Sequence, residues 1–328
     1  METESVRRAA ALVCLIAVLA FLGLSAKGSA LGAKSLPVQG MAEQRGEPPA
    51  KAATPALSLA PALPEQDGTT VKDSGPQPVE SYVELLLQQT LAEIQRPGMS
   101  EYERAKAAYD YLLDSVTSDD PVCPELWRIY QEDRNTPIPY LENRAMSILR
   151  FHVGMCEDQA AALVLLLRGM GLEAEYLPGF MFTLAGEPMD HAWVQAKVDG
   201  VWYHLDPELE GYMARRDRVA YRYFLKGDQE IGRTHRWGEK TLETGWLTQA
   251  QKEEVRQQWL GRLCPQDYPV LPKARIRERW DEVDVEQARK EAAKEVAAWE
   301  AEHGELPPLQ LNIAPPVFGF EGYGPTLA

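Results

Sequence analysis

The sequence lacks the short motifs by which most nucleotide-binding and zinc-binding proteins are identified. It contains no G-x-x-x-x-G-K-[ST] and no G-x-G-x-x-G opening a helix, so nucleotide cofactors have no support. The four cysteines show neither C-x-x-C nor Cys/His ligand spacing, which disfavours a structural zinc site. Basic residues do not cluster as phosphate neutralisation requires, and the formal net charge is −15, which argues against nucleic acid. We therefore expect no cofactor, no metal and no nucleic-acid partner.

What is present is the composition of a globular protein. The 328 residues are 45% hydrophobic and 25% charged, which excludes a disordered or fibrous chain. The length alone corresponds to about two domains.

The N-terminus has the order of a secretory signal. Arg7 and Arg8 precede the apolar run 9–24, and small residues follow, with a plausible cleavage point after Ala30. An uncleaved anchor is the alternative, because flanking residues could extend the run across a bilayer. Both readings place the rest of the chain outside the cytoplasm, secreted or anchored to the cell membrane. Cys14 lies within the run and is interpreted as one of its apolar residues, without a role of its own.

Differences in amino-acid composition divide the rest of the chain, residues 31–328, into segments. Residues 31–78 are rich in proline and poor in aromatic residues, which predicts a disordered linker. Residues 304–328 repeat Pro, Gly and isolated aromatics without a period, which predicts a low-complexity tail. Between them we expect the main folded domain, the part that carries the motifs described below, over 79–240 and a C-terminal helical extension over 241–303.

Three helices are expected before the first chemically interesting motif. A leucine-rich helical pattern covers Val79–Gln95, and Ser100 with Glu103 forms a capping box that opens the second helix. The apolar face of that second helix predicts core packing. A shorter helical stretch lies around 141–149.

Cys156 lies where a buried helix is expected to begin. The run 160–167 is apolar on all sides and is closed by Gly169 and Gly171. Unpaired N–H groups and the positive end of the helix dipole meet at such a start, and they favour a thiolate. Glu157 and Asp158 are explained as first-turn acids that complement the dipole. The cysteine is therefore a candidate nucleophile.

A predicted hairpin supplies the groups that a cysteine nucleophile needs. Asp199-Gly200 is a strong signal for a two-residue turn. If these two residues form the turn, Val198 pairs with Val201 and Val194 pairs with Leu205. His191 and Asp206 then share the polar face as diagonal neighbours. An imidazole oriented by a carboxylate is the base that activates a thiol.

These motifs together resemble the transglutaminase-like superfamily of papain-like cysteine enzymes. The resemblance runs from about Ser100 to Trp237 and rests on the segments 103–112, 154–160, 167–172, 191–194 and 199–207. It implies an α+β papain-like core in which the nucleophile helix packs on an antiparallel β-sheet, with additional N- and C-terminal helices. It also implies that Cys156 is the nucleophile, His191 the base and Asp206 the residue that orients the base.

Several further side chains are candidates for the cleft. Trp193 and Trp202, on the polar face of the hairpin, are candidate cleft walls, and core packing is an equal alternative. Tyr140 is our candidate for the side chain that would complete an oxyanion hole, because no clear donor stands out.

The other histidines have structural interpretations. His152 is expected to be structural, and His204 is assigned no catalytic step. His235 lies in a basic, aromatic loop after the core, where packing is favoured over substrate contact.

Two expectations concern the rest of the chain. Cys123 and Cys264 are the only possible disulfide pair if Cys156 stays free. A late helix marked by Val285, Ala288 and Trp299 should dock on the domain or serve as a partner-binding arm.

The sequence thus predicts an exported cysteine acyl-transfer enzyme that acts on protein or peptide amides, with cell-surface material as a candidate substrate, through a Cys156 thioester. The alternatives are a cysteine protease or amidase of the same fold, with water as acceptor, and a non-catalytic cell-surface binding module. The membrane is expected to be involved only through the N-terminal apolar segment.

Overall fold

The computed structural model describes a single folded region of the chain. The described residues are 79–122, 124–130, 137–183, 186–214, 218–242, 248–277, 283–312, 315 and 318. The predicted signal or anchor over 1–30, the linker over 31–78 and the end of the tail lie outside them. No helix within the described residues is long and apolar enough to cross a membrane.

The first half of this region is helical. It contains α2 (Val79–Ile94), α3 (Glu101–Ser115), the 3-10 helix η1 (Pro124–Tyr130), α4 (Tyr140–Phe151) and α5 (Cys156–Gly169). The capping box that opens α3 is present: the Ser100 side chain accepts from the N–H of Glu103, and the Glu103 carboxylate accepts from the N–H of Ser100. The predicted helices at 79–95 and around 141–149 are both confirmed.

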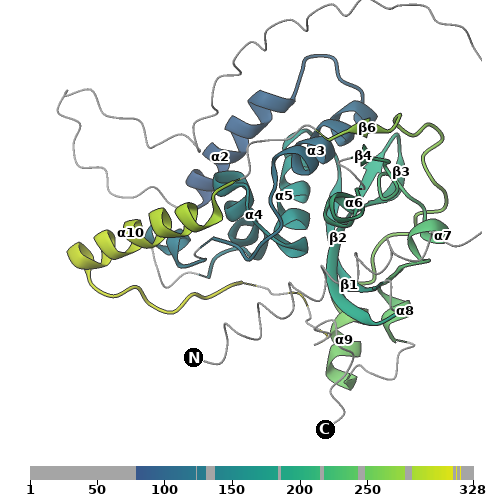
Figure 1. Cartoon of the computed structure of the whole chain (residues 1–328). Helices are drawn as coiled ribbons and strands as arrows, with labels where there is room; N and C mark the ends of the chain where they lie inside the picture. The colour runs from purple at the N-terminus through teal and green to yellow at the C-terminus, as the bar shows by residue number, and fades with distance from the viewer. Residues whose placement is uncertain are drawn as a thin grey trace, which may run out of the picture. The chain divides into compact units, whose positions relative to one another are not determined.

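A four-stranded antiparallel sheet follows. Its strands are β1 (Ala174–Phe182), β2 (Pro188–Val198), β3 (Val201–Leu205) and β5 (His235–Arg236), in the order β3-β2-β1-β5. Helices α2 to α5 gather on one side of this sheet (Figure 1). This arrangement is the α+β fold with a helix packed on an antiparallel sheet that the sequence predicted.

The β2–β3 hairpin has the predicted register. Val198 pairs with Val201 and Val194 pairs with Leu205. Asp199 and Gly200 have φ of 50° and 81°, which are the positive values that a type I′ turn requires at both central positions. The turn chemistry therefore determines which side chains share a face of the sheet.

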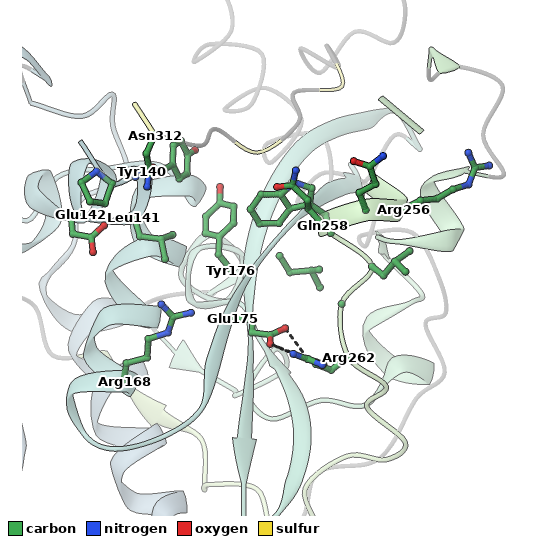
Figure 2. Close-up of a pocket in the computed structure, with 16 residues that line it drawn as sticks. Tyr140, Leu141, Glu142, Arg168, Glu175, Tyr176, Arg256, Gln258, Arg262 and Asn312 are labelled. Carbon is green, nitrogen blue, oxygen red and sulfur yellow. Dashed lines mark hydrogen bonds and ion pairs between the residues drawn. The ribbon is translucent and has the colours of Figure 1, made fainter. Parts of the chain in front are cut away.

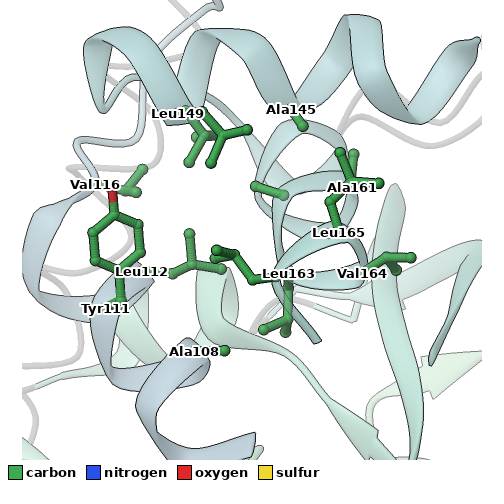
Figure 3. Packing of buried hydrophobic residues seen from close by; sticks show 14 of the residues in the cluster. Ala108, Tyr111, Leu112, Val116, Ala145, Leu149, Ala161, Leu163, Val164 and Leu165 are labelled. Atoms are coloured by element: carbon green, nitrogen blue, oxygen red, sulfur yellow. The ribbon is translucent and has the colours of Figure 1, made fainter. Parts of the chain in front are cut away.

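Helix α5 is the centre of the core. Residues 158–167 of this helix are buried, as expected for a helix that is apolar on every side. Its side chains contact α3, α4 and the sheet, and Leu163 and Val164 are fully buried (Figure 3). Because α5 is enclosed by the rest of the core, its first residue is held in a fixed place.

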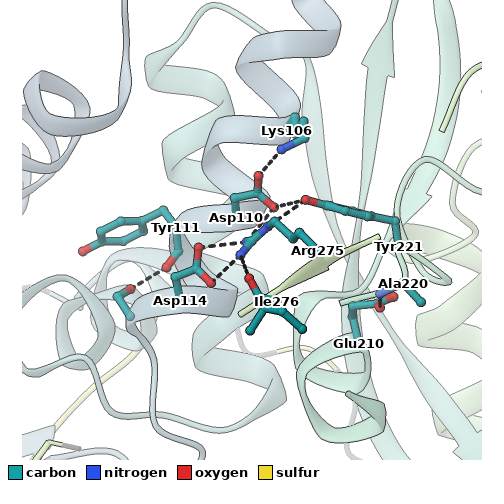
Figure 4. Close-up of polar contacts among 10 residues, drawn as sticks. Lys106, Asp110, Tyr111, Asp114, Glu210, Ala220, Tyr221, Arg275 and Ile276 are labelled. Carbon is teal, nitrogen blue, oxygen red and sulfur yellow. Dashed lines mark hydrogen bonds and ion pairs between the residues drawn. The ribbon is translucent and has the colours of Figure 1, made fainter. Parts of the chain in front are cut away.

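The later elements attach to this core. They are α6 (Pro207–Met213), β4 (Arg218–Val219), α7 (Asp228–Ile231), α8 (Glu239–Leu242), α9 (Gln249–Gln258), β6 (Arg275–Ile276) and α10 (Val285–His303). Arg275 joins β6 to α3 through ion pairs with Asp110 (3.0 Å) and Asp114 (2.8 Å) and a hydrogen bond to the Tyr221 hydroxyl (Figure 4). The segment after the sheet is thereby fastened to the helical half.

The late helix docks on the domain, the first of the two alternatives considered for it. Ala288 and Ala292 of α10 are buried, and α10 contacts η1. Glu295 of α10 forms an ion pair with Arg150 of α4 at 2.7 Å.

The disulfide considered between Cys123 and Cys264 is not formed. Cys264 is a free and buried thiol that lies 3.2 Å from the side-chain nitrogen of Gln195, and burial raises the pKa of this thiol. Cys123 itself lies outside the described residues.

Candidate active site

Cys156 is the first residue of α5. Met155 before it is extended, and its N–H donates to the Asp158 carboxylate at 2.9 Å, which fixes the entry into the helix. Cys156 is partly exposed, whereas residues 158–167 of the helix are buried. The thiol therefore lies at an accessible helix start, where main-chain N–H groups and the helix dipole favour negative charge.

Arg144 of α4 holds the first turn of α5 from the other side. Its guanidinium forms ion pairs with Glu157 and, at 3.0 Å, with Asp158. Burial raises the pKa of Asp158 to about 6 even though Arg144 acts against that change. The two first-turn acids thus do more than complement the dipole, because they also tie α5 to α4.

His191 and Asp206 meet as the hairpin register predicts. His191 Nε2 lies 2.7 Å from Asp206 Oδ2, and each side chain is only 1% exposed. Asp206 is itself fixed, because its Oδ1 accepts from the Leu209 N–H and its carbonyl oxygen accepts from the Tyr109 hydroxyl. It serves at once as the partner of His191 and as the N-cap of α6.

The protonation of this pair follows from its surroundings. Burial alone would lower the pKa of His191, but the Asp206 carboxylate and the nearby Cys156 thiol raise it well above its ordinary value. Burial would likewise raise the pKa of Asp206, yet His191 and His235 hold it well below its ordinary value. The geometry therefore favours an imidazolium between a carboxylate and the cysteine.

A second histidine bonds the same carboxylate oxygen. His235 Nε2 lies 3.0 Å from Asp206 Oδ2, and the His235 side chain is fully buried. Sequence reasoning placed His235 in a loop after the core and did not connect it with the triad. Its position arises from the pairing of β5 with β1, a contact between distant segments that no local pattern indicates.

Trp193 supports the site from within. It is fully buried, and its ring stacks on His191 with centroids 5.9 Å apart. Its indole N–H donates to His204 Nδ1 at 2.9 Å, and His204 Nε2 in turn lies 3.0 Å from Asp228 Oδ1. Trp193, considered as a cleft wall, thus packs in the interior, the alternative that had been given equal weight.

Two groups in the described region contain side chains of the kinds that bind metal ions, namely His191, Asp206 and His235, and His204, Asp228 and Cys264. In each, histidine Nε2 faces a carboxylate oxygen at 2.7 to 3.0 Å. These are hydrogen-bond distances, and the facing atoms already satisfy one another. Each of the two groups is therefore a hydrogen-bonded network of side chains.

A pocket of about 710 Å³ lies beside the start of α4 (Figure 2). Tyr140 and Tyr176 form part of its wall, with ring centroids 5.7 Å apart in an edge-to-face contact. Burial raises the pKa of Tyr176, and Tyr140, Glu157 and Cys156 contribute smaller effects in the same direction. Tyr140, considered for the cleft and as an oxyanion donor, is therefore a wall of this pocket.

A further aromatic residue forms part of the same wall. Trp259 lines the pocket, and the buried indole Nε1 of Trp259 has no hydrogen-bond partner among the described residues. Trp202, the remaining cleft candidate, lies elsewhere. It pairs with Lys197 in the hairpin, and Arg262 lies over its ring at 5.5 Å.

The segment that carries the three residues is similar to a known protein family. The profile of the transglutaminase-like superfamily matches residues 88–207, which include Cys156, His191 and Asp206. No curated protein sequence matches the chain significantly. The segment 88–207 is therefore similar to the core of the transglutaminase-like superfamily of cysteine proteases and acyltransferases.

Several solved structures share limited similarity with part of the chain. A candidate cysteine protease from Cytophaga hutchinsonii is 20% identical, with 38% of this chain and 37% of that chain covered and a TM-score of 0.28. A protein described as a TGase is 21% identical, with 39% and 31% covered and a TM-score of 0.26. The arylamine N-acetyltransferase NAT3 from Bacillus cereus, described with a Cys-His-Glu triad, is 15% identical, with 39% and 51% covered and a TM-score of 0.28. The chain thus spans about a third to a half of the length of these neighbours.

Proposed function

We propose that the protein is an exported cysteine acyl-transfer enzyme that acts on protein or peptide amides through a thioester on Cys156. The observation that supports this most strongly is the placement of a partly exposed cysteine at a helix start beside a buried His191–Asp206 pair. A nucleophile, a base and a group that orients the base are the three parts of thiol-based acyl transfer.

The chemistry follows from the positions of these atoms. His191 holds the proton of the Cys156 thiol, and the thiolate sulfur attacks the amide carbonyl carbon. Main-chain N–H groups at the start of α5 stabilise the developing oxyanion. The C–N bond then breaks, the departing amine takes the proton from His191, and a thioester remains.

The second half of the reaction releases the acyl group. An amine or a water molecule attacks the thioester, and His191 takes the proton of that nucleophile. The C–S bond breaks, and the sulfur regains its proton from His191. Attack by an amine gives transglutamination, whereas attack by water gives hydrolysis, as in a protease or amidase.

The pocket beside Tyr140 and Tyr176 is the proposed recognition surface for the acyl donor. Its aromatic walls suit a side chain with apolar surface, and the unpartnered indole N–H of Trp259 suits an oxygen acceptor on that side chain or on the peptide backbone. We further propose that the N-terminal apolar segment delivers the enzyme to the outside of the cell, where surface proteins or peptides are the substrates.

The reaction is tested with casein as acyl donor and dansylcadaverine as amine acceptor, using the full chain and its Cys156→Ser variant. Fluorescence in the casein band that depends on Cys156 identifies amine transfer. New peptide termini without incorporated amine identify the hydrolase instead. If neither product forms with casein or with a peptide library, and Cys156 resists iodoacetamide, the enzyme proposal is overturned in favour of a binding module.

A further inference from the structure

We propose that His235 is a positioning residue of the triad, which holds Asp206 in place and limits the proton affinity of His191. This inference rests on the proposed function, because it concerns the same thiol–imidazole pair. It adds a fourth side chain to the machinery, one that touches neither the substrate nor the sulfur.

The geometry gives His235 and His191 equivalent positions on one oxygen. His191 Nε2 and His235 Nε2 lie 2.7 and 3.0 Å from Asp206 Oδ2, and the two ring centroids are 5.4 Å apart. All three side chains are at most 1% exposed. Water cannot replace either contact in such a site.

The hydrogen bonds determine which nitrogens carry protons. An ionised carboxylate only accepts, so both Nε2 atoms must donate to Asp206. Burial lowers the pKa of His235, which keeps this ring neutral and leaves Nδ1 as an acceptor. The Thr234 hydroxyl lies 2.8 Å from Nδ1, where it can donate to that nitrogen. His235 is therefore a neutral donor in one fixed tautomer.

Two features of the fold bring His235 to this position. Met181 of β1 pairs with His235, and Arg236 beside it pairs with Phe180. Gly179 makes this close approach possible, because a Cβ atom there would lie 2.3 Å from the Arg236 carbonyl oxygen and 2.8 Å from the Trp193 ring. The glycine thus has a direct role in assembling the triad.

The hydrogen bond from His235 to Asp206 changes how strongly Asp206 attracts the proton of His191. A carboxylate oxygen that accepts from two donors attracts each proton less strongly than one that accepts from a single donor. The ionisable groups around His235 among the described residues are Asp206, His191, His204 and Tyr223, whereas Glu208 acts on His191 and Asp206. Among them only Asp206 favours a charged His235, and the imidazolium of His191 opposes it. His235 therefore adds a donor without adding a positive charge.

This balance matters for the proposed reaction. His191 must accept the thiol proton and later give a proton to the departing amine. Without His235, Asp206 would hold the imidazolium more tightly, and His191 would become a weaker acid. The step that releases the amine would then slow.

The test compares His235→Phe with His235→Gln in the full chain. Phenylalanine removes the donor, whereas glutamine can present an amide N–H near the position of Nε2. The titration of His191 is followed by ¹⁵N NMR of the imidazole rings, and the alkylation of Cys156 by iodoacetamide is followed across pH by peptide mass spectrometry. Thr234→Val serves as a milder variant, because it removes only the hydroxyl that fixes the tautomer.

The expected result is that His235→Phe moves the titration midpoint of His191 to higher pH, with His235→Gln close to the wild type and Thr234→Val between them. With a peptide substrate, kcat should fall by about 10- to 100-fold in His235→Phe, as for the loss of a hydrogen bond to a charged group, while KM is unchanged.

The inference is overturned if a folded His235→Phe or Thr234→Val protein keeps the wild-type His191 titration. This outcome differs from failure of the proposed function, in which the alkylation of Cys156 would not respond to His191→Ala either. If His235→Phe does not fold, the Thr234→Val titration alone decides the matter.

Discussion

His191 and His235 lie on either side of one carboxylate oxygen, with their ring centroids 5.4 Å apart. The first ring faces the partly exposed thiol, and the second faces the interior next to Trp193 and Tyr223. The two imidazoles are equally buried, and they differ in what lies on their other side: the Cys156 thiol for His191 and the aromatic interior for His235. Several predictions about the carboxylate and its surroundings depend on this arrangement.

Replacing Asp206 with Asn should abolish most acyl transfer. The side-chain oxygen of Asn can still cap α6, but the amide carries no charge to stabilise the His191 imidazolium. We expect a fall in kcat of about 10²- to 10⁴-fold, the range associated with a general base. Asp228→Asn is the matched control, because Asp228 makes the equivalent contact with His204 outside the triad. Equal losses in the two variants would contradict the role assigned to Asp206.

Gly179→Ala should destabilise the protein. The added Cβ would collide with the Arg236 main chain and the Trp193 ring, which are both enclosed. Overpacking of this kind costs about 1–3 kcal/mol, and it should be seen in the free energy of unfolding from urea titration. Gly211→Ala is the control, because only a Leu113 methyl carbon lies near, at 3.7 Å. Gly211 is in a helix, so its replacement should be neutral or stabilising by up to about 1 kcal/mol.

His152 should make the protein sensitive to mild acid. Burial lowers the pKa of His152 to about 4, whereas an unfolded histidine titrates near about 6.5. Between these pH values the unfolded chain binds a proton that the folded chain does not, so the free energy of unfolding falls as the pH is lowered.

The variant His152→Asn isolates this contribution. His152 has a φ of 57°, a left-handed conformation that asparagine tolerates. We expect the wild type to lose about 1–3 kcal/mol more than the variant between pH 6.5 and pH 4. Urea titrations at several pH values measure this difference, and parallel curves for the two proteins would refute the assignment.

Trp259→Phe should weaken substrate binding without slowing the chemistry. The variant keeps an aromatic wall and removes the buried indole N–H, which has no hydrogen-bond partner among the described residues. Loss of one neutral hydrogen bond corresponds to an increase in KM of about 2- to 10-fold, with kcat unchanged. Leu263→Ala, at a side chain that is 76% exposed and outside the pocket lining, is the control. An unchanged KM in Trp259→Phe would exclude this pocket as the recognition surface.

Local sequence signals predicted the parts of the site that depend on local geometry. The Asp199-Gly200 turn determines the hairpin register, and the register alone places His191 near Asp206. The buried apolar run 160–167 determines where α5 lies, and therefore that Cys156 begins it. These relationships follow from periods of two and 3.6 residues, which can be read from a single sequence.

The remaining parts depend on contacts between distant segments. His235 reaches Asp206 because a two-residue strand pairs with β1, and so short a strand leaves no recognisable pattern. Trp193 lies on the polar face of its strand, yet it is buried because α7 and the segment around Trp237 cover that face. Trp259, which forms part of the pocket wall, lies more than 100 positions after Cys156 in the sequence. The alternation of polar and apolar residues in a strand does not show that a segment later in the sequence will cover the polar face.

The central claim is that Cys156 and His191 form a working pair. The most direct measurement is the pH dependence of iodoacetamide labelling at Cys156 in the full chain and in His191→Ala, with the labelled cysteine identified by peptide mass spectrometry. The account predicts that Cys156 of the wild type is labelled faster at neutral pH than a free thiol and that its labelling slows in the variant. A Cys156 that labels like a free thiol, or not at all in the folded protein, and is indifferent to His191 would contradict it.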